Sequence, residues 1–465
     1  MSQAINNSYA VSRYNVFIPL KKNRVLTYNG FSGGMALWEA IEKEVFTKIE
    51  NGRPVNKNDQ KIVRPLVYGG FIVDKDFDER EDLEKQYRIH RYNHNIMTLT
   101  IAPTLMCNFA CDYCYQGKEK NKGSMKVEVQ DAVVALAQRA VSSGIKHLHV
   151  AWYGGEPLLG KKIIKSLSQR FIEICDQRGV QYDAMMVTNG YLLDAATMDD
   201  LGSYRVKTIQ VTFDGPPADH DARRVLHSGK PTFERIVDNF KASIDRTKIR
   251  FSTRVNIDSR NIKNIPELFD LLRENGLANK PNFGIYLSPV EAMTQGCQDI
   301  AGVCLGKLGY GQQEADLYRL CFEKGLTKLP YPPRFHGGCA AVKPNGLVII
   351  PNGDIHKCWH TVSHPERKTG SVFKPEEVRE DSTYAAWLDW NPFDDANCKN
   401  CKLLPVCTGA CGYKFLYAED TRGEAASLPC ISWKYNIHER LVLRAEKAGV
   451  IKPEDYDKKQ FREEL

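Results

Sequence analysis

The chain has 465 residues, of which 42% are hydrophobic, and a formal net charge of +7. At about 150 residues per domain, this length predicts three domains. The modest charge excludes the strongly basic profile of a nucleic-acid-binding protein. No apolar run approaches the roughly 18 residues of a membrane-spanning helix, and the first residues do not form a secretory signal.

Fourteen cysteines without a secretion signal indicate a reducing compartment, the cytoplasm, where such patterns serve metals or catalysis rather than disulfides. Three cysteines form one short loop, seven lie toward the C-terminus, and four are scattered: Cys175, Cys297, Cys304 and Cys321. The scattered four need no special role, because free cysteine is among the most buried residue types.

Residues 1–92 are expected to form the first domain. Apolar periodicity and the Gly69-Gly70 break predict strands over 14–20, 25–28 and 71–73 and helices over 36–46 and 57–66. The charged run 74–91 is predicted to be a solvated linker or linker helix. This arrangement resembles the winged-helix modules that hold the leader of a substrate peptide along a sheet edge. The alternative is a stabilising N-terminal cap.

The second domain, 93–320, alternates strands and helices in the way of a parallel α/β sheet. Six strands are predicted, over 97–102, 147–153, 184–188, 208–213, 250–257 and 282–287. Five helices are predicted between them, over 127–142, 163–175, 195–201, 233–244 and 265–274. These units predict a partial (β/α)6 barrel, TIM-like but open on one side, because residues 290–330 do not supply the two further pairs of a closed barrel.

Directly after the first of these strands come Cys107, Cys111 and Cys114, spaced C-x3-C-x2-C. A cubane iron–sulfur cluster has four iron corners, which cysteine thiolates usually fill. Three thiols therefore leave one corner open for a small chelating ligand. The loops that follow barrel strands are also where such folds place chemistry. The alternatives for this loop are a zinc site or three unrelated buried thiols.

Three further motifs follow later strands: Gly154-Gly155-Glu156-Pro157, Thr188-Asn189-Gly190, and Thr212-Phe213-Asp214-Gly215-Pro216 leading into His220-Asp221-Ala222-Arg223-Arg224. Together with the cysteine loop, these motifs resemble the radical S-adenosylmethionine (radical SAM) enzymes. In that family S-adenosylmethionine chelates the open iron, and the reduced cluster cleaves it to a 5′-deoxyadenosyl radical.

The resemblance implies that Cys107, Cys111 and Cys114 hold the radical SAM 4Fe-4S cluster. It also implies a set of contacts to S-adenosylmethionine, made by Tyr113, Gly155, Glu156, Asn189, Thr212 and Arg224. Arg224 matches the arginine that pairs with the carboxylate of the cofactor, a contact suited to a guanidinium.

Residues 321–440 are expected to form the third domain, which contains seven cysteines besides Cys321. Cys339 and Cys358 are spaced C-x13-G-x4-C, and a later array is spaced C-x2-C-x5-C-x3-C. This pattern resembles the SPASM domain, which carries two auxiliary 4Fe-4S clusters and would bring the total to three. The resemblance assigns auxiliary cluster II to Cys398, Cys401, Cys407 and Cys430, and auxiliary cluster I to Cys339, Cys358 and Cys411. The alternative for the array is a pair of structural zinc sites.

Auxiliary cluster I has only three assigned ligands. Either Cys321 or His336 supplies the fourth, or one iron is left open for substrate, which is the reading we favour. Residues 441–465 are expected to be a charged tail after a helix over 433–448.

The whole chain resembles a maturase of ribosomally synthesised and post-translationally modified peptides (RiPPs). The resemblance implies a radical that abstracts hydrogen from a residue of a precursor peptide, giving a thioether, C–C or C–O crosslink or another modification. It also implies a flavodoxin- or ferredoxin-type electron donor as partner. Neither nucleic acid nor membrane is expected as a partner.

Two alternatives remain. Anaerobic sulfatase-maturating enzymes, which form formylglycine, carry an aspartate proton acceptor directly after the second cysteine of the array, where this chain has Trp359. His356 and His360 flank Cys358 and could move protons, but packing roles suit them better. The non-enzymatic alternative is a zinc-binding adaptor, which would be colourless and rich in zinc, whereas three cubane clusters hold roughly twelve irons.

Overall fold

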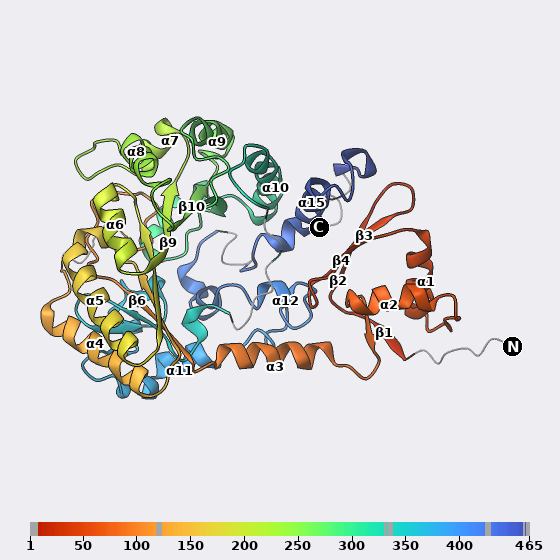
Figure 1. Ribbon diagram of the computed structural model, residues 1–465, viewed down its shortest axis with the longest axis horizontal. Helices are drawn as coiled ribbons and strands as arrows, with labels where there is room; N and C mark the ends of the chain where they lie inside the picture. The colour runs from red at the N-terminus through yellow and green to blue at the C-terminus, as the bar shows by residue number, and fades with distance from the viewer. Residues whose placement is uncertain are drawn as a thin grey trace.

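The computed structural model describes residues 8–117, 123–329, 332, 338–423, 429–458 and 461. Figure 1 shows a barrel-like body with helices on its outside, a smaller N-terminal unit at the far end of the long axis, and C-terminal segments between them. Within the described ranges, no helix has the length and apolar character needed to span a membrane.

The N-terminal unit combines small antiparallel sheets with two helices. A three-stranded sheet has the order β2-β3-β4, and a two-stranded sheet pairs β1 with β5. The strands are β1 (Tyr9–Val11), β2 (Asn15–Pro19), β3 (Val25–Asn29), β4 (Met35–Trp38) and β5 (Ile72–Asp74). The helices are α1 (Ala40–Glu50) and α2 (Gln60–Tyr68). The predicted hairpin of the first long strands is present as β2 and β3.

The predicted helix over 36–46 begins too early. Residues 35–38 instead form β4, which pairs antiparallel with β3, and α1 starts only at Ala40 after a capping box between Glu39 and Glu42. The side chain of Trp38 explains the difference, because it is buried against Phe46 and Phe71. Packing across the sheet thus overrides a pattern that also fits a helix.

The charged run 74–91, predicted to be a solvated linker or a linker helix, contains helix α3 (Glu79–Arg91), capped by the side chain of Asp78. Most of its polar residues face solvent, but Glu79, Leu83, Tyr87 and Arg91 are buried. In Figure 1 this helix runs from the N-terminal unit along the C-terminal segments to the barrel. It therefore connects all three parts of the chain.

Arg91 at the end of α3 is almost fully buried. Its guanidinium donates hydrogen bonds to backbone carbonyls of the C-terminal segments at 2.7–3.1 Å, namely those of Val342, Trp387, Leu388 and Trp390. A fifth partner is the hydroxyl of Tyr87, one helical turn earlier, which accepts from Nη1 at 3.3 Å. One side chain thus fixes the linker helix to the region that carries the later cysteines.

The predicted partial barrel is confirmed. Strands β6 to β11 are all parallel and lie in sequence order within one nine-stranded sheet. They are β6 (Ile96–Ile101), β7 (His147–Trp152), β8 (Gln181–Thr188), β9 (Val206–Phe213), β10 (Arg250–Ile257) and β11 (Phe283–Pro289). The five predicted helices are α4 (Val127–Ser142), α5 (Lys161–Gln177), α6 (Ala195–Ser203), α8 (Phe233–Ser243) and α9 (Ile265–Glu274).

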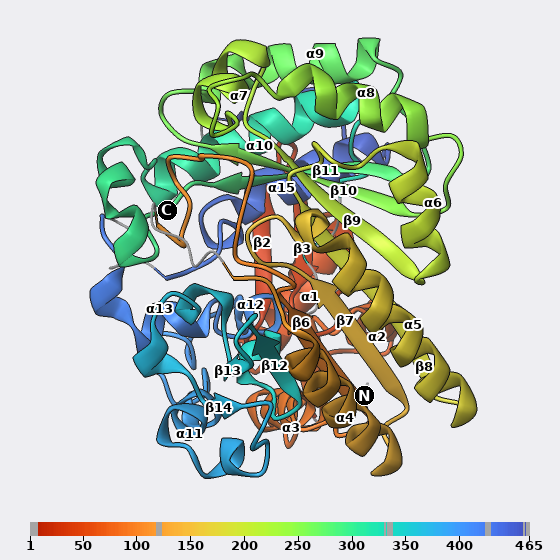
Figure 2. The same ribbon diagram turned by 90° about the vertical axis from the view of Figure 1, so that its left-hand side faces the viewer.

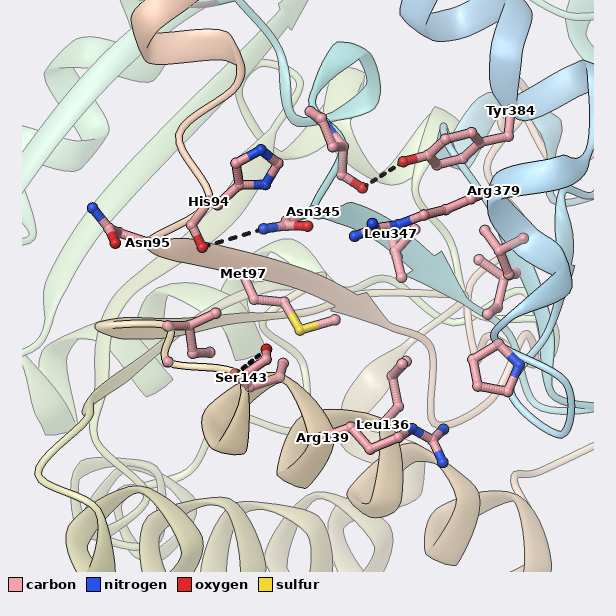
Figure 3. A pocket seen from close by; sticks show the side chains of 17 residues that line it. His94, Asn95, Met97, Leu136, Arg139, Ser143, Asn345, Leu347, Arg379 and Tyr384 are labelled. Carbon is pink, nitrogen blue, oxygen red and sulfur yellow. Dashed lines mark hydrogen bonds between the residues drawn. The ribbon is translucent and has the colours of Figure 1, made fainter.

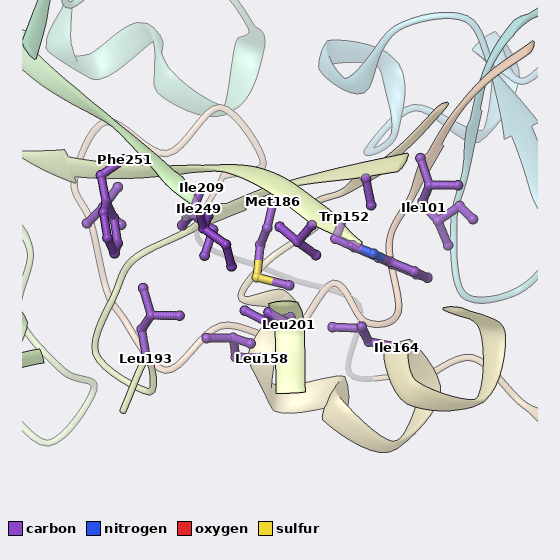
Figure 4. Packing of buried hydrophobic residues seen from close by; sticks show 14 of the residues in the cluster. Ile101, Trp152, Leu158, Ile164, Met186, Leu193, Leu201, Ile209, Ile249 and Phe251 are labelled. Carbon is purple, nitrogen blue, oxygen red and sulfur yellow. The ribbon is translucent and has the colours of Figure 1, made fainter. Parts of the chain in front are cut away.

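Two helices of the barrel were not predicted, α7 (Pro217–Arg223) and α10 (Lys307–Glu323). In Figure 2 the helices cover the outer face of the strands. The core between them is apolar, and Figure 4 shows Trp152, Met186 and Ile209 of the strands facing Leu158, Ile164 and Leu201. Alternate strand residues point the other way, into the barrel interior.

The C-terminal segments extend the barrel sheet. Strand β12 (Gly346–Ile349) pairs parallel with β6, and β13 (Asp354–His356) and β14 (Gly370–Ser371) continue the sheet antiparallel. Short helices follow: α11 (Ser382–Asp389), α12 (Leu404–Cys407) and α13 (Gly412–Leu416). The sheet therefore continues past the expected boundary at 320/321, because the apolar run 346–350 adds a strand to the open edge of β6.

The end of the chain is not a free charged tail. Helix α15 (Trp433–Lys447) agrees with the predicted helix, and the residues that follow it include buried Ile451, Tyr456 and Phe461. These side chains share one core cluster with Ile18 and Leu26 of the N-terminal sheet. The described residues after α15 therefore pack against the N-terminal sheet.

Candidate active site

The cysteine loop follows the C-terminal end of β6 and is fixed by contacts on two sides. Phe109 is buried and bridges to Leu226, and the amide of Ala110 donates to the carbonyl of Val225 at 2.9 Å. Asp112 accepts a hydrogen bond from Nη1 of Arg260 at 2.7 Å. Sequence-distant segments therefore hold Cys107, Cys111 and Cys114 at the mouth of the barrel.

The three thiols are close but do not converge on one point. Cys111 lies close enough to Cys107 and Cys114 for their charges to act on its thiol. Burial is the main cause that raises the pKa of this thiol to about 12. Four thiolates on one zinc ion lie about 3.8 Å apart, given a Zn–S distance of about 2.3 Å. Among the residues that the structure describes, no cysteines gather three ligand atoms within 4.8 Å. This spread fits a cluster in which each thiolate binds its own iron, and does not fit a zinc site.

The loop after β7 packs directly on the cysteine loop. The amide of Glu156 donates to the carbonyl of Met106 at 2.8 Å, and that of Gly155 to the carbonyl of Thr104 at 3.1 Å. A Cβ atom at Gly155 would lie 2.1 Å from the carbonyl oxygen of Met106. The glycine is thus required for close approach between two backbone segments.

Replacing Gly155 by alanine is therefore expected to displace the cysteine loop. We expect the iron content to fall by up to about four irons per chain, measured by iron analysis, and S-adenosylmethionine cleavage to fall at least tenfold, measured by release of 5′-deoxyadenosine. The matched control is Gly202→Ala on α6, where a Cβ atom meets nothing within 4 Å and should leave both values unchanged. Normal iron content in Gly155→Ala would contradict the proposed contact between the two loops.

Glu156 is fully buried, and its carboxylate holds the end of β8 in place. It accepts from the hydroxyl of Thr188 and the amide of Asn189, both at 2.7 Å, and from the amide of Leu158 at 3.0 Å. The side chain of Asn189 in turn donates to Oδ1 of Asn108 in the cysteine loop at 2.7 Å. Glu156 and Asn189, predicted from separate motifs, thus form one network beside Cys107.

Arg224 and Tyr113 meet on the other side of the loop. Nη1 of Arg224 donates to the Tyr113 hydroxyl at 2.6 Å, and Asn256 on β10 donates to the same oxygen at 3.2 Å. Arg224 is buried, with its guanidinium 5.5 Å from the centre of the Phe109 ring. Thr212 is buried on β9, beside Arg254 of β10. Of the six residues predicted to contact the cofactor, Tyr113 therefore lies in the cysteine loop, and Gly155, Glu156, Asn189 and Arg224 contact that loop or the residues just before it.

The later cysteines form two groups. In the first group, Cys398 lies close enough to Cys407 and Cys430 for their charges to act on it, and Cys407 is affected in the same way by Cys430 and Cys401. Burial is the main cause that raises the pKa of Cys398 to about 12 and the pKa of Cys407 to about 11. Nζ of Lys434 lies 3.6 Å from Sγ of Cys430. These are the four cysteines that the sequence pattern assigns to one cluster.

The second group contains Cys339, Cys358 and Cys411. Burial raises the pKa of Cys358 well above its usual value, and the charges of Cys411 and Cys339 raise it further. Cys321, considered above as a fourth ligand, lies in α10 and packs in the barrel core, so it cannot join this group. His336, the other residue considered, lies outside the described residues.

Aromatic rings connect the cysteine loop to this second group. Tyr115 follows Cys114 and lies 5.2 Å from the ring of His360, which lies 5.1 Å from the ring of Tyr413, close to Cys411. Tyr153, at the end of β7, stacks on Trp359 at 5.1 Å. The sequence named Trp359 and His360 but gave no sign that they contact the barrel, because that contact depends on the parallel pairing of β6 with β12.

Residues 101–272 match the Radical SAM superfamily. This range contains the cysteine loop and all six residues predicted to contact the cofactor. The chain therefore contains a radical SAM domain. It is therefore an enzyme, as the sequence predicted.

Among curated proteins, the radical SAM cyclopropyl synthase TigE of Paramaledivibacter caminithermalis is 22% identical over 427 residues, 86% of this chain and 82% of that protein. A probable GTP 3′,8-cyclase of Methanocaldococcus jannaschii is 26% identical over 40% of this chain and 58% of that protein. The first similarity extends well beyond the radical SAM domain at both ends.

Two solved structures share the fold. One is anSMEcpe with bound AdoMet, with a TM-score of 0.58 and 17% identity over 77% of this chain and 98% of that one. The other is Streptococcus suis SuiB bound to the precursor peptide SuiA, with a TM-score of 0.51 and 15% identity over 88% of this chain and 97% of that one.

One polar group within the radical SAM barrel resembles a metal site but is explained by hydrogen bonds. His147 Nε2 and His149 Nδ1 lie 2.8 and 2.5 Å from the carboxylate oxygens of Asp183. Ligands of a single tetrahedral zinc ion bound at about 2.0–2.2 Å lie about 3.4 Å apart. These contacts are shorter, so they link neighbouring strands by charge-assisted hydrogen bonds.

A cavity of about 420 Å³ lies away from this chemistry. Figure 3 shows Met97, Leu136 and Leu347 lining it, with Arg139 and Arg379 at its sides. It lies at the start of β6 and β12, whereas the cysteine loop follows the end of β6. It is therefore not the active site of this radical SAM enzyme.

Proposed function

We propose that this radical SAM enzyme modifies a residue of a ribosomally synthesised precursor peptide. The main observation behind the proposal is that two sets of cysteines lie near each other at the barrel mouth. The rings of Tyr115, His360 and Tyr413 form a chain of contacts from the loop of Cys114 to that of Cys411. A substrate held between them contacts both. The mouth lies on the open side of a partial barrel, which admits an extended chain.

The cofactor assignments extend this proposal. Cys107, Cys111 and Cys114 would hold the radical SAM cluster, Cys339, Cys358 and Cys411 auxiliary cluster I, and the set Cys398, Cys401, Cys407 and Cys430 auxiliary cluster II. When bound, the first cluster and S-adenosylmethionine supply a 5′-deoxyadenosyl radical that abstracts hydrogen from the peptide. The product would be a thioether, C–C or C–O crosslink or another modification, and a flavodoxin or ferredoxin in the cytoplasm would supply electrons.

The chain's own residues would bind and orient the reactants. Arg224 is buried and held by Tyr113, and its remaining N–H donors would bind the cofactor carboxylate. Gly155, Glu156, Asn189 and Thr212 would complete the S-adenosylmethionine site. The rings of Tyr153 and Trp359 exclude water from one side of the mouth. No carboxylate follows Cys358, which disfavours formylglycine formation.

The N-terminal unit would bind the leader of the peptide at β4. This strand pairs only with β3 among the described strands, and Met35, Ala36 and Leu37 are half-buried. An extended segment can add to such an edge through backbone hydrogen bonds. The likeness of fold to SuiB, which was solved with a precursor peptide, supports a peptide substrate.

The direct test uses anaerobically reconstituted enzyme, reductant, S-adenosylmethionine and the short peptide encoded beside the gene. We expect 5′-deoxyadenosine together with a changed mass or stereochemistry of the peptide, and roughly twelve irons per chain. An unaltered peptide contradicts the proposed function. A colourless protein with stoichiometric zinc would favour the zinc-binding adaptor instead.

A further inference from the structure

Arg254 lies on the inner face of the barrel, near the C-terminal end of β10. Its strand neighbours Phe251 and Val255 pack outward in the apolar core, so Arg254 points inward. Across the sheet it lies beside Thr212 of β9 and Tyr286 of β11. Its guanidinium is 6.0 Å from the centre of the Tyr286 ring. Arg254 therefore stands in the space between the predicted cofactor site and the barrel mouth.

Most of the hydrogen-bonding capacity of Arg254 is unused. Its Nε donates to Oδ1 of Asn256 at 2.6 Å. In the part of the chain that the structure describes, Nη1 and Nη2 have no hydrogen-bond partner, and no carboxylate lies within 4.0 Å. Neither nitrogen belongs to the fully enclosed polar atoms, so both face open space inside the barrel. Four N–H donors of this permanently charged guanidinium are therefore available to bind an acceptor.

The carboxylates around the mouth are already engaged. Asp214 and Asp258 pair with Arg223, Asp258 also pairs with Arg260, and Glu291 pairs with both Lys307 and Lys414. Because two lysines share Glu291, that group carries one excess positive charge, which adds to that of Arg254. The interior of the mouth is therefore electropositive and suited to an anion.

We propose that Arg254 binds a carboxylate of the peptide substrate, so that the segment entering the barrel carries an aspartate, a glutamate or the chain terminus close to the reacting residue. This inference rests on the proposed function and specifies its substrate class. A planar guanidinium binds a carboxylate through two parallel hydrogen bonds. An amide in the same place would leave donors unpaired, so the site rejects neutral side chains.

The test measures binding rather than turnover. Three capped tripeptides serve as probes: Ac-Gly-Asp-Gly-NH2, Ac-Gly-Asn-Gly-NH2 and Ac-Gly-Asn-Gly-OH, which separate a side-chain carboxylate from a terminal one. Each is titrated calorimetrically into the cluster-containing enzyme with S-adenosylmethionine bound and no reductant. We expect at least one carboxylate probe to bind at least tenfold more tightly than the neutral probe, and R254Q to remove the difference while R254K keeps part of it.

The matched control is Arg250→Gln, which removes a guanidinium from the opposite end of the same strand and should keep the full discrimination. The affinity for S-adenosylmethionine, measured by equilibrium dialysis, should be unchanged in R254Q. Carboxylate probes that bind no better than the neutral probe overturn the proposal. The proposal is also overturned if R254Q loses affinity for S-adenosylmethionine but still binds carboxylate probes more tightly than the neutral probe. That result would assign Arg254 to the cofactor site. Discrimination by an enzyme that leaves every peptide unmodified would refute the proposed function alone.

Discussion

Replacing Cys107, Cys111 and Cys114 together by alanine is expected to abolish release of 5′-deoxyadenosine and to remove about four irons per chain. The physical reason is that these three thiols lie together in the loop after β6, and each would bind a different iron. The loop that carries them is held by Phe109 and Asp112, which the substitutions leave in place. The auxiliary iron should therefore remain.

The matched control is Cys175→Ala, because Cys175 is buried in the helix layer of the barrel. It should keep all the iron and full cleavage at a cost of roughly 1 kcal/mol in stability. Retained cleavage in the triple variant would refute the assignment of these cysteines. An equal loss of iron in the control would show that iron content reports folding rather than ligation.

Arg91→Ala is expected to lower the free energy of unfolding by on the order of 4 kcal/mol, because four buried carbonyls lose their donor and each such loss costs about 1–3 kcal/mol before water compensates. The contacts join α3 to residues 342 and 387–390. We therefore expect faster amide hydrogen exchange in α3 and α11, with little change in β7 to β9.

Arg88→Ala on the same helix is the control, since Arg88 is exposed and pairs only with Glu84 one turn away. It should change stability by less than about 0.5 kcal/mol. Unchanged exchange in Arg91→Ala would mean that apolar packing alone fixes α3. Loss of iron without faster exchange would point to a direct role of Arg91 in cluster binding.

The barrel was predictable because its signals are local. Each strand from β6 to β11 is an apolar run followed by a helix with regular periodicity, and each motif begins at or just after the end of a strand. Glu156, Asn189 and Arg224 could therefore be assigned to one end of the sheet before any contact was known. The sequence predicted Gly155 as a cofactor contact but gave no sign that it is also required for close contact between two loops.

What could not be predicted depends on contacts between distant segments. The pairing of β12 with β6 brings Trp359 and His360 to Tyr153 and Tyr115, and no local pattern encodes that pairing. The many charged residues of α3 gave no indication that one of its sides is buried. Strand β4 was not predicted because its sequence also suits a helix. The terminal residues 451–461 carry too few apolar side chains to reveal that they pack on the N-terminal sheet.

The central claim is that this enzyme takes hydrogen from a peptide. Its most direct test is isotope transfer from a precursor peptide deuterated at carbon to 5′-deoxyadenosine in one turnover, read by mass spectrometry. The account predicts 5′-deoxyadenosine that is heavier by one deuterium together with an altered peptide. Unlabelled 5′-deoxyadenosine beside an unchanged peptide would contradict it.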